Sequence, residues 1–466
     1  MGSSQLPDLR QLSVILGDTG RSVDSDWRPV DVCIDSRDCR PGSLFFALPG
    51  ETTDGHAFVQ AAASAGAGAA VVRQASDLQG NAWPVPVLVV SDALRALQRL
   101  AAWYVTTHLV GTTVRIGITG SNGKTSTKEM MAAALRRTVG YDAVFASAGN
   151  LNSETGLPLS VLATPPGSAY AIYEMAMSNP GEIAPLAEIV RPDFAVITNI
   201  GTAHIGQLGS RDAIAAEKKN IASAFDGSQT LVFPAADDYA DYLSTGINGV
   251  VLPVSAASLD VDIAEREGHA RVTLGDTTVE LPMLGAHHGA NALLVLAVVR
   301  AMDLDAETAV AALGEMDAPQ GRGRFLSLPG GIRVLDDTYN ANPESMHAAL
   351  QAAETAGARV FVLGDMLELG SLEASGHLAV LRDALQRSPR LVICVGPRFA
   401  GAVKTVKGDA VVPSSLELLC VPTSDEAGEL LCRSARSGDV ILLKGSRGIA
   451  LERAIAALHT REAVDA

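Results

Sequence analysis

The chain has 466 residues, of which 47% are apolar, and a formal net charge of -16 at pH 7. This length exceeds what one hydrophobic core usually supports, so we expect two to four domains. The acidic balance argues against a surface that coats nucleic acid or an anionic membrane, but it is compatible with a local basic pocket for a small anionic substrate.

The N-terminus and the cysteines favour a cytoplasmic protein. The opening stretch, MGSSQLPDLRQLSVILG, has no basic segment followed by a long apolar run, so it predicts no signal peptide. No stretch approaches the length of a transmembrane helix, and the five cysteines form no Cys-x-x-Cys pair. We therefore expect reduced thiols, a cytoplasmic location and no insertion into a membrane.

Apolar runs and turns divide the chain into three α/β blocks, at residues 1–110, 111–317 and 318–466. The first has short strands such as VDVCID and SLFFALPG, and it closes with a helical stretch. The second alternates strands and helices, which predicts a parallel sheet with both faces covered, and the glycine-rich loop described below indicates the phosphate-loop ATPase type. The third repeats this alternation and predicts a Rossmann-like α/β domain.

A β-rich patch interrupts the second block at residues 231–283. It contains a predicted hairpin, RVTLGDTTVELP, in which alternating residues flank a Gly-Asp turn. The patch predicts an added sheet within the central domain.

The stretch GITGSNGKTSTKEM has the Gly-Lys-Thr ending of a phosphate-binding loop, but not its usual glycine spacing. It leaves a strand in which Val114, Ile116 and Ile118 alternate and enters a helix, a setting where backbone N–H groups converge on an anion. Lys124 would meet the outer phosphates of a nucleotide, and the Thr125 hydroxyl would reach its magnesium ion. The setting predicts a nucleotide site despite the unusual spacing.

Two polar residues are expected at the same rim of this sheet. Glu174 ends the strand AYAIYE, and His204 follows the strand FAVITNI after a short turn. Ligands of open parallel sheets bind beyond the carboxyl ends of the strands. A carboxylate and an imidazole there could hold magnesium, although magnesium prefers oxygen ligands, and a loop histidine bonded to backbone is an equal alternative for His204.

A lysine lies on the apolar face of the predicted helix RDAIAAEKKNIASAF. Ile214, Ile221 and Phe225 form one apolar stripe, and Lys218 falls on it. Lys219 points about 100° away, toward solvent. An inward lysine needs a partner or a chemical role, unless only its stem is covered and its ammonium reaches the surface.

Three further stretches carry polar groups near the start of the third block. GAHHGANA places His287 and Asn291 on one helix face. QGRGRF supplies Arg322 and Arg324, either of which could clamp a terminal phosphate from a neighbouring domain. DDTYNANPES gathers acids and amides at the end of a strand, although turn chemistry alone would explain the Asn-Ala-Asn-Pro.

Together these motifs resemble those of the Mur ligases, the ATP-dependent amide-forming enzymes of peptidoglycan precursor synthesis, over essentially the whole chain. GITGSNGKTST is similar to the family's own variant of the phosphate loop. GNLNSETGLPLS, DDTYNANPESM and GDMLELG are similar to the branch that adds D-alanyl-D-alanine to UDP-N-acetylmuramoyl-tripeptide. IDSRDCRPGSLFFALPGETTDGHAF resembles the region that holds the uridine nucleotide in that branch.

The resemblance implies a role for each matching residue. It implies catalytic roles for Lys124, Glu174, His204, Lys218 and Arg322. It implies ATP binding by Gly120, Ser121, Asn122, Gly123, Lys124, Thr125, Ser126, His287, Asn291, Arg322, Asp337, Tyr339 and Asn340. It implies substrate binding by Ser36, Arg37, Asp54, Gly55, His56, Asn150, Asn152 and Asn342. It implies metal binding by Thr125, Glu174, His204 and, once carbamylated, Lys218.

The implied reaction converts the tripeptide carboxylate into an acyl phosphate, which the dipeptide amine then attacks. Its implied cofactors are ATP, two magnesium ions and a carbamylated lysine at Lys218. The first block would hold the UDP-sugar peptide, the second ATP and the third the dipeptide, in a monomer. Arg322 would reach the phosphate only when the third domain swings in.

Several alternatives share parts of this pattern. The sister ligase that adds the third, diamino acid residue would carry an Asp-Asn-Pro-Arg motif, which this chain lacks. A folate polyglutamate ligase would lack the uridine-type N-terminal region. A phosphate-loop NTPase or kinase would leave the N-terminal region and GDMLELG unexplained. The intact set of Lys124, Glu174, His204 and Lys218 argues against a non-catalytic nucleotide-binding protein. The sequence leaves open the third residue of the tripeptide (diaminopimelate or lysine), the oligomeric state, the strictness for D-alanine and the carbamylation of Lys218.

Overall fold

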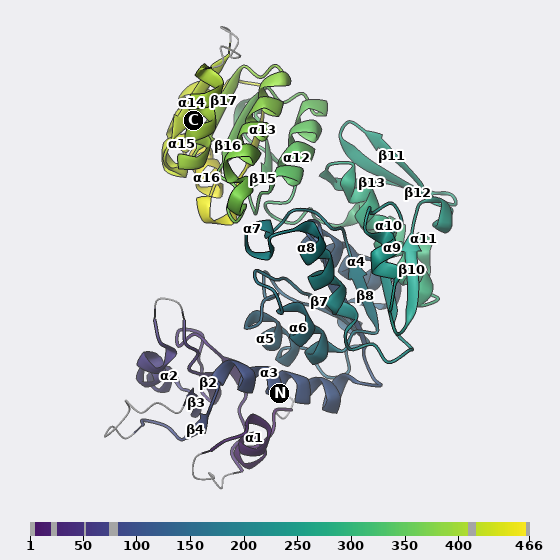
Figure 1. Ribbon diagram of the computed structural model, residues 1–466, viewed down its shortest axis with the longest axis vertical. Helices are drawn as coiled ribbons and strands as arrows, with labels where there is room; N and C mark the ends of the chain where they lie inside the picture. The colour runs from purple at the N-terminus through teal and green to yellow at the C-terminus, as the bar shows by residue number, and fades with distance from the viewer. Residues whose placement is uncertain (1–4, 20–25, 51–52, 74–82, 409–415, 463–466) are drawn as a thin grey trace.

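The computed structural model describes residues 5–19, 26–50, 53–73, 83–408 and 416–462 (Figure 1). The first four residues of the opening stretch, and Glu51 and Thr52 of the uridine-type motif, lie outside the described residues. Three α/β regions follow one another along the long axis of the molecule, with the N-terminal region at one end and the C-terminal region at the other. Each helix in the described part of the chain is too short or too polar to span a lipid bilayer.

The N-terminal region is a parallel sheet with strand order β1-β2-β3-β4. Its strands are β1 (Asp31–Cys33), β2 (Ser43–Phe46), β3 (Ala69–Arg73) and β4 (Val87–Val90), and its helices are α1 (Leu9–Leu16), α2 (Val59–Ala65) and α3 (Ala93–Tyr104). Asp92 caps α3 by accepting from the backbone N–H of Arg95. The helical stretch predicted at the end of the first block is confirmed. Helix α3 joins this region to the next, because Leu97 packs in the N-terminal core and Tyr104 in the central one.

The central region is a six-stranded parallel sheet in the order β10-β9-β8-β5-β7-β6. Its strands are β5 (Val114–Thr119), β6 (Val144–Ala146), β7 (Tyr170–Glu174), β8 (Phe194–Ile197), β9 (Thr230–Pro234) and β10 (Val250–Val254). Its helices are α4 (Lys124–Val139), α5 (Gly156–Leu162), α6 (Ile183–Val190), α7 (Ile205–Leu208), α8 (Arg211–Lys219), α9 (Ala240–Ser244), α10 (His287–Ala301) and α11 (Ala306–Glu315).

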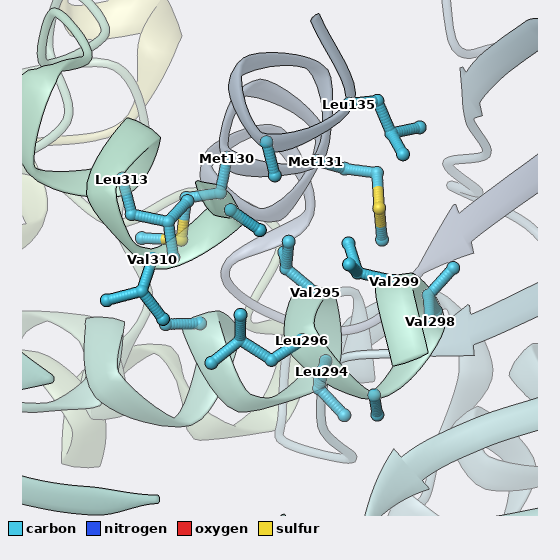
Figure 2. Packing of buried hydrophobic residues seen from close by; sticks show 14 of the residues in the cluster. Met130, Met131, Leu135, Leu294, Val295, Leu296, Val298, Val299, Val310 and Leu313 are labelled. Carbon is cyan, nitrogen blue, oxygen red and sulfur yellow. The ribbon is translucent and has the colours of Figure 1, made fainter. Parts of the chain in front are cut away.

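Alternation along the strands builds one core on each face of this sheet. Ile172 and Val196 point to the face covered by α4, α10 and α11, whereas Tyr173 and Ile197 point to the face covered by α5, α6 and α8. Figure 2 shows how Met130 and its neighbours on α4 interdigitate with side chains of α10 and α11. The helix that follows the glycine loop is therefore held by packing along most of its length.

The predicted β-rich patch is two structures rather than one. Its first strands, β9 and β10, belong to the main parallel sheet. Only β11 (Asp262–Arg266), β12 (His269–Leu274) and β13 (Thr277–Leu284) form a separate antiparallel sheet, and β12 and β13 are the predicted hairpin. The expectation of one added sheet over 231–283 was wrong for β9 and β10. An apolar run such as Leu231–Phe233 is buried on both faces, and its periodicity does not reveal to which sheet it belongs.

The C-terminal region is a six-stranded sheet in the order β14-β15-β19-β16-β17-β18, parallel except for β14. Its strands are β14 (Arg324–Ser327), β15 (Arg333–Asp337), β16 (Val360–Gly364), β17 (Leu391–Val395), β18 (Glu417–Val421) and β19 (Val440–Lys444). Its helices are α12 (Pro343–Thr355), α13 (Glu373–Gln386), α14 (Pro397–Gly408), α15 (Ser424–Ser434) and α16 (Glu452–Glu462). Helices α12 to α14 cover one face and α15 and α16 the other, which confirms the predicted open α/β domain.

Candidate active site

The central and C-terminal sheets share a cavity of about 760 Å³. The glycine loop between β5 and α4, with the ends of β7 and β8, forms the central wall. The ends of β15 and β19 and residues 367–369 form the C-terminal wall, where Figure 1 shows α7 and α12 on either side of the junction. Because ligands of open parallel sheets bind at the carboxyl ends of the strands, this cavity is the candidate active site.

The glycine loop has the conformation that an anion site requires, although its glycines are displaced. Gly123 caps α4 at φ 82°, a left-handed conformation that favours glycine. A Cβ on Gly120 would lie 1.8 Å from Thr198 Oγ1, so only glycine fits there. Lys124 Nζ donates to the carbonyls of Gly120 (2.7 Å) and Ser121 (3.3 Å). The loop therefore presents its lysine and the N-terminus of a long helix to the cavity.

The charge of Lys124 is sensitive to its surroundings. The pKa of its ammonium is lowered to about 8, chiefly by burial; Glu174 opposes this shift, and the Arg322 charge adds to it. An anion beside the ammonium would favour its charged form. A phosphate bound beside Lys124 would therefore raise this pKa and keep the side chain positively charged.

Replacing Gly123 by alanine is expected to weaken ATP binding more than it weakens the fold. A Cβ at this position would lie 2.8 Å from Asn291 Oδ1 and push that amide aside. Gly111, at φ 79° with nothing within 4 Å of a Cβ, is the matched control for backbone strain alone. We expect each variant to lose about 1 kcal/mol of unfolding free energy, and calorimetric titration to show weakened ATP binding only in Gly123→Ala. Equal ATP affinity in the two variants would contradict the placement of Asn291.

Glu174 and Thr125 form the polar centre of the cavity. Glu174 is buried at the end of β7, where its Oε2 accepts from Thr125 Oγ1 (2.9 Å) and its Oε1 from Asn152 Nδ2 (2.7 Å). Thr125 Oγ1 in turn accepts from Arg322 Nη2 (3.0 Å). Thr125 and Asn152 thus bind the two oxygens of one carboxylate, and Arg322 reaches it through Thr125. Ser126, also predicted at this site, is buried and lines the cavity.

His204 lines the same cavity but contacts the other domain. It adopts φ 63° just before α7, and its Nδ1 lies 2.6 Å from Glu368 Oε2. Beside this imidazole, the pKa of Glu368 lies below its usual range. Glu368 belongs to GDMLELG, so this motif supplies the C-terminal partner of the predicted metal ligand. Within the described ranges, no hydrogen bond or ion pair joins His204 to Glu174.

The chemistry of these side chains fits magnesium bound together with a nucleotide. In the part of the chain that the structure describes, no group of three or more His, Cys, Asp or Glu side chains could hold a metal ion alone. Magnesium that is bound to phosphates needs only one or two protein carboxylates. Glu174 with the hydroxyl of Thr125 meets that requirement.

Lys218 lies inward, as predicted. Helix α8 ends at Lys219 and a 3₁₀ turn follows, so the predicted helix is shorter than expected, yet Lys218 is only 1% exposed. Burial lowers its pKa well below the usual range, the Lys124 charge lowers it further, and Glu217 opposes the change. Lys219 points outward and donates to the carbonyl of Tyr242 (2.7 Å). Lys218 is not among the residues that line the cavity.

The start of α10 provides polar groups for a ligand beside the glycine loop. His287 and Asn291 both line the cavity, which confirms that they share a face. Asn291 Nδ2 is buried without a hydrogen-bond partner in the described structure. The partial loss of water around its ring lowers the pKa of His287, which favours its neutral form. An unpaired amide donor next to a neutral imidazole suits a heterocyclic base.

Arg322 reaches the central domain, whereas Arg324 does not. The Arg322 guanidinium stacks 3.8 Å from the centre of the Tyr339 ring, and its Nε is buried without a partner in the described structure. Arg324 is exposed on β14. In this structure Arg322 already contacts Thr125 beside the phosphate loop, and the expected swing of the third domain stays a prediction.

The motif DDTYNANP lines the C-terminal wall with paired groups. Asp337 forms an ion pair with Lys444 (2.6 Å), which also donates to the carbonyl of Asn340 (3.0 Å). Asn342 caps α12 by accepting from Ser345 N–H. Its Nδ2 donates to Asn122 Oδ1 of the glycine loop (2.8 Å). Asn342 therefore links the two domains in this structure, in addition to the substrate contact predicted for it.

The predicted uridine-nucleotide residues lie outside the cavity, in the N-terminal region. Ser36 and Arg37 follow β1, and Asp54, Gly55 and His56 follow β2. They share the carboxyl edge of one parallel sheet, where His56 Nδ1 lies 2.5 Å from Asp54 Oδ1. Asn150, also predicted to bind substrate, is exposed and not among the residues that line the cavity.

Sequence reasoning missed several polar residues of the cavity, and four of them form or join its walls. Asn199 accepts from Asn122 N–H through its side chain (3.0 Å) and so braces the glycine loop. Glu344 accepts from the Thr202 hydroxyl (2.7 Å) across the domain junction. Glu368 and Lys444 complete the set. Asn199 and Lys444 could have been found, since each stands at the carboxyl end of a predicted strand.

Family models cover most of the chain in succession. The Mur ligase family catalytic domain matches residues 31–104, the Mur ligase middle domain residues 118–299, and the Mur ligase glutamate ligase domain residues 321–447. The UDP-N-acetylmuramoyl-tripeptide–D-alanyl-D-alanine ligase of Treponema pallidum is 38% identical over 436 residues, which cover 91% of this chain and 92% of that relative.

Solved structures agree with this assignment. A crystal structure of MurF from Acinetobacter baumannii has a TM-score of 0.84 at 28% identity, and covers 97% of this chain and 99% of that one. MurF ligase from Thermotoga maritima, solved in complex with ADP, has a TM-score of 0.77 at 25% identity, with 94% and 98% covered. With its cavity between two α/β domains and its matches over nearly the whole length, the chain belongs to the Mur ligase family, in the branch of UDP-N-acetylmuramoyl-tripeptide–D-alanyl-D-alanine ligases.

Proposed function

We propose that the protein is the ATP-dependent ligase that joins D-alanyl-D-alanine to UDP-N-acetylmuramoyl-tripeptide, giving the pentapeptide, ADP and phosphate. The observation that carries this proposal is the convergence of Lys124, Thr125, Glu174 and Arg322 on one cavity between two domains. Membership of the ligase branch supplies the substrates, which are those in the names of the relatives. The sister ligase and a simple NTPase are not favoured, because the relatives over 91% of the chain bear the D-alanyl-D-alanine ligase name.

The chemical problem is that a carboxylate in water has no good leaving group. A tripeptide carboxylate oxygen attacks the γ-phosphorus of ATP, which releases ADP and forms an acyl phosphate. The dipeptide amine then attacks the acyl carbon, phosphate leaves with that oxygen, and the nitrogen loses its proton to form the amide. The protein contributes alignment and the neutralisation of negative charge.

The described side chains support a division of labour in these steps. Lys124 and the N-terminus of α4 hold the phosphates, and Arg322 approaches from the C-terminal domain toward the transferred phosphoryl group. Asn291 and His287 hold the adenine. Glu174 and Thr125 would hold magnesium and His204 would hold a second ion, and magnesium when bound would supply neutralisation of negative charge.

The three regions suit three substrates. Residues 1–110 would hold the UDP-sugar, 111–317 ATP, and 318–466 the dipeptide. An acyl phosphate needs protection from water, which the C-terminal domain would provide at the junction. The growing peptide would then extend from the N-terminal sheet edge toward the cavity.

The mass of the nucleotide-sugar product tests this proposal. The full-length protein is incubated with ATP, magnesium, UDP-N-acetylmuramoyl-tripeptide and D-alanyl-D-alanine, and the nucleotide-sugar product is weighed by mass spectrometry. We expect a product heavier by the dipeptide less one water, formed only with all substrates present. ADP formation without any heavier product would show that the protein hydrolyses ATP and makes no amide, as an NTPase does.

Lys218 is the residue we propose to be carbamylated. Its low pKa favours the neutral amine, which adds CO₂ and loses a proton to become an anionic carbamate. We expect ¹³C NMR with labelled bicarbonate to show a carbamate signal that Lys218→Arg abolishes, with kcat lowered roughly a hundredfold. Lys219→Arg, on the exposed face next to it, is the control and should keep both. A carbamate signal that persists in Lys218→Arg would refute the assignment.

A further inference from the structure

A second buried lysine lies one helical turn beyond the phosphate loop and has no part in the steps above. Lys128 on α4 is fully buried. Its Nζ donates to the carbonyl of Ser147 (2.7 Å), is 3.5 Å from that of Gly149, and lies 2.9 Å from Glu129 Oε1. These three acceptors match the three donors of an ammonium group, so the buried charge is satisfied.

The two carbonyls that bind Lys128 lie in the segment at residues 147–152. This segment contacts Glu174 through hydrogen bonds. Ser147 Oγ accepts from the backbone N–H of Glu174 (3.3 Å). Asn152, at the far end of the segment, donates to Glu174 Oε1 (2.7 Å), and its carbonyl accepts from Ala176 N–H (2.8 Å). The segment therefore contacts Glu174 on its backbone and on its carboxylate.

Helix α4 thus positions the Glu174 carboxylate in two ways. Thr125, three residues before Lys128, holds one carboxylate oxygen directly. Lys128 anchors the segment whose Asn152 holds the other oxygen. An ammonium donates only, so it fixes carbonyls in a way that an apolar side chain of the same length cannot. Loss of the ammonium would leave the Ser147 carbonyl without this donor and free the segment to move.

We infer that Lys128 is a positioning residue of the ligase: by anchoring the carbonyls of Ser147 and Gly149, it places Asn152 and so orients the Glu174 carboxylate for the magnesium of bound ATP. This inference rests on the proposed function. It assigns to Lys128 an effect on metal affinity that a purely structural lysine would not have. Groups that orient a metal ligand typically change metal affinity about 10- to 100-fold when removed.

The test measures Mn²⁺ binding to the ATP complex of the full-length protein by electron paramagnetic resonance. We expect Lys128→Met to bind Mn²⁺ at least about tenfold more weakly than wild type. Glu129→Gln, which keeps both carbonyl contacts of Lys128, is the matched control and should bind Mn²⁺ as wild type does. If Lys128→Met does not fold, Lys128→Gln, which keeps an amide donor, is measured in its place.

A double-mutant cycle tests whether Lys128 affects Mn²⁺ binding through Asn152. If Lys128 acts through Asn152, then Lys128→Met combined with Asn152→Ala should bind Mn²⁺ no more weakly than the worse single variant. The inference would be overturned if the two substitutions weakened Mn²⁺ binding by the product of their single effects. It would also be overturned if Lys128→Met lowered the Tm and left the Mn²⁺ affinity unchanged. Because the readout is binding and not amide formation, a failure of the proposed function would appear separately, as a missing product with wild-type protein.

Discussion

Arg322→Ala is expected to lower kcat roughly a thousandfold, the scale at which an arginine supplied to a transferring phosphoryl group acts. Arg322 comes from the C-terminal domain, yet its Nη2 lies 3.0 Å from Thr125 Oγ1 beside the phosphate loop. Its stacking on Tyr339 fixes the direction of the guanidinium, and its buried Nε has no partner in the described structure. Steady-state kinetics should show a loss in kcat with little change in the KM for the dipeptide.

Arg324→Ala is the matched control, since it removes the same charge two residues away. Arg324 is exposed on β14 and is not among the residues that line the cavity. We expect this variant to keep wild-type kcat. Equal losses in both variants would show that net charge, and not the placement of one guanidinium, explains the effect.

Glu174→Gln is expected to lower kcat about 100- to 1,000-fold and to raise the magnesium concentration needed for half-maximal activity. The substitution keeps the size of the side chain and one carbonyl acceptor, so the contacts with Thr125 and Asn152 are only partly lost. It removes the negative charge that a magnesium ligand needs. Magnesium titrations of the ligase reaction measure the shift.

Glu188→Gln provides the comparison for this substitution. Glu188 is an exposed carboxylate on α6, away from the cavity. The magnesium dependence of this variant should match that of wild type. A Glu174→Gln enzyme with normal magnesium dependence would remove Glu174 from the metal site and leave it a structural role.

Local patterns predicted most of the fold and the rim of the site. The strand–glycine loop–helix order placed Lys124 and Thr125 correctly, because parallel strands bring their carboxyl ends to one edge. The helical period placed Lys218 inward although α8 ends earlier than expected. His287 and Asn291 were placed on one face for the same reason.

Contacts between distant segments could not be predicted in this way. The approach of Glu368 to His204 joins two loops from different domains, and no periodicity encodes it. The assignment of β9 to the main sheet depends on its pairing with β8, which the apolar run itself does not specify. Lys128 looks like any lysine of a charged helix face, and only the fold reveals that it is buried.

The most direct test of the central claim follows the oxygen of the tripeptide carboxylate. UDP-N-acetylmuramoyl-tripeptide labelled with ¹⁸O in its terminal carboxylate is turned over with ATP and D-alanyl-D-alanine, and the released phosphate is analysed by mass spectrometry. The acyl-phosphate route predicts one ¹⁸O in each phosphate released, with no release when the dipeptide is left out. Unlabelled phosphate, released whether or not the dipeptide is present, would show that water attacks ATP and that the cavity houses an NTPase.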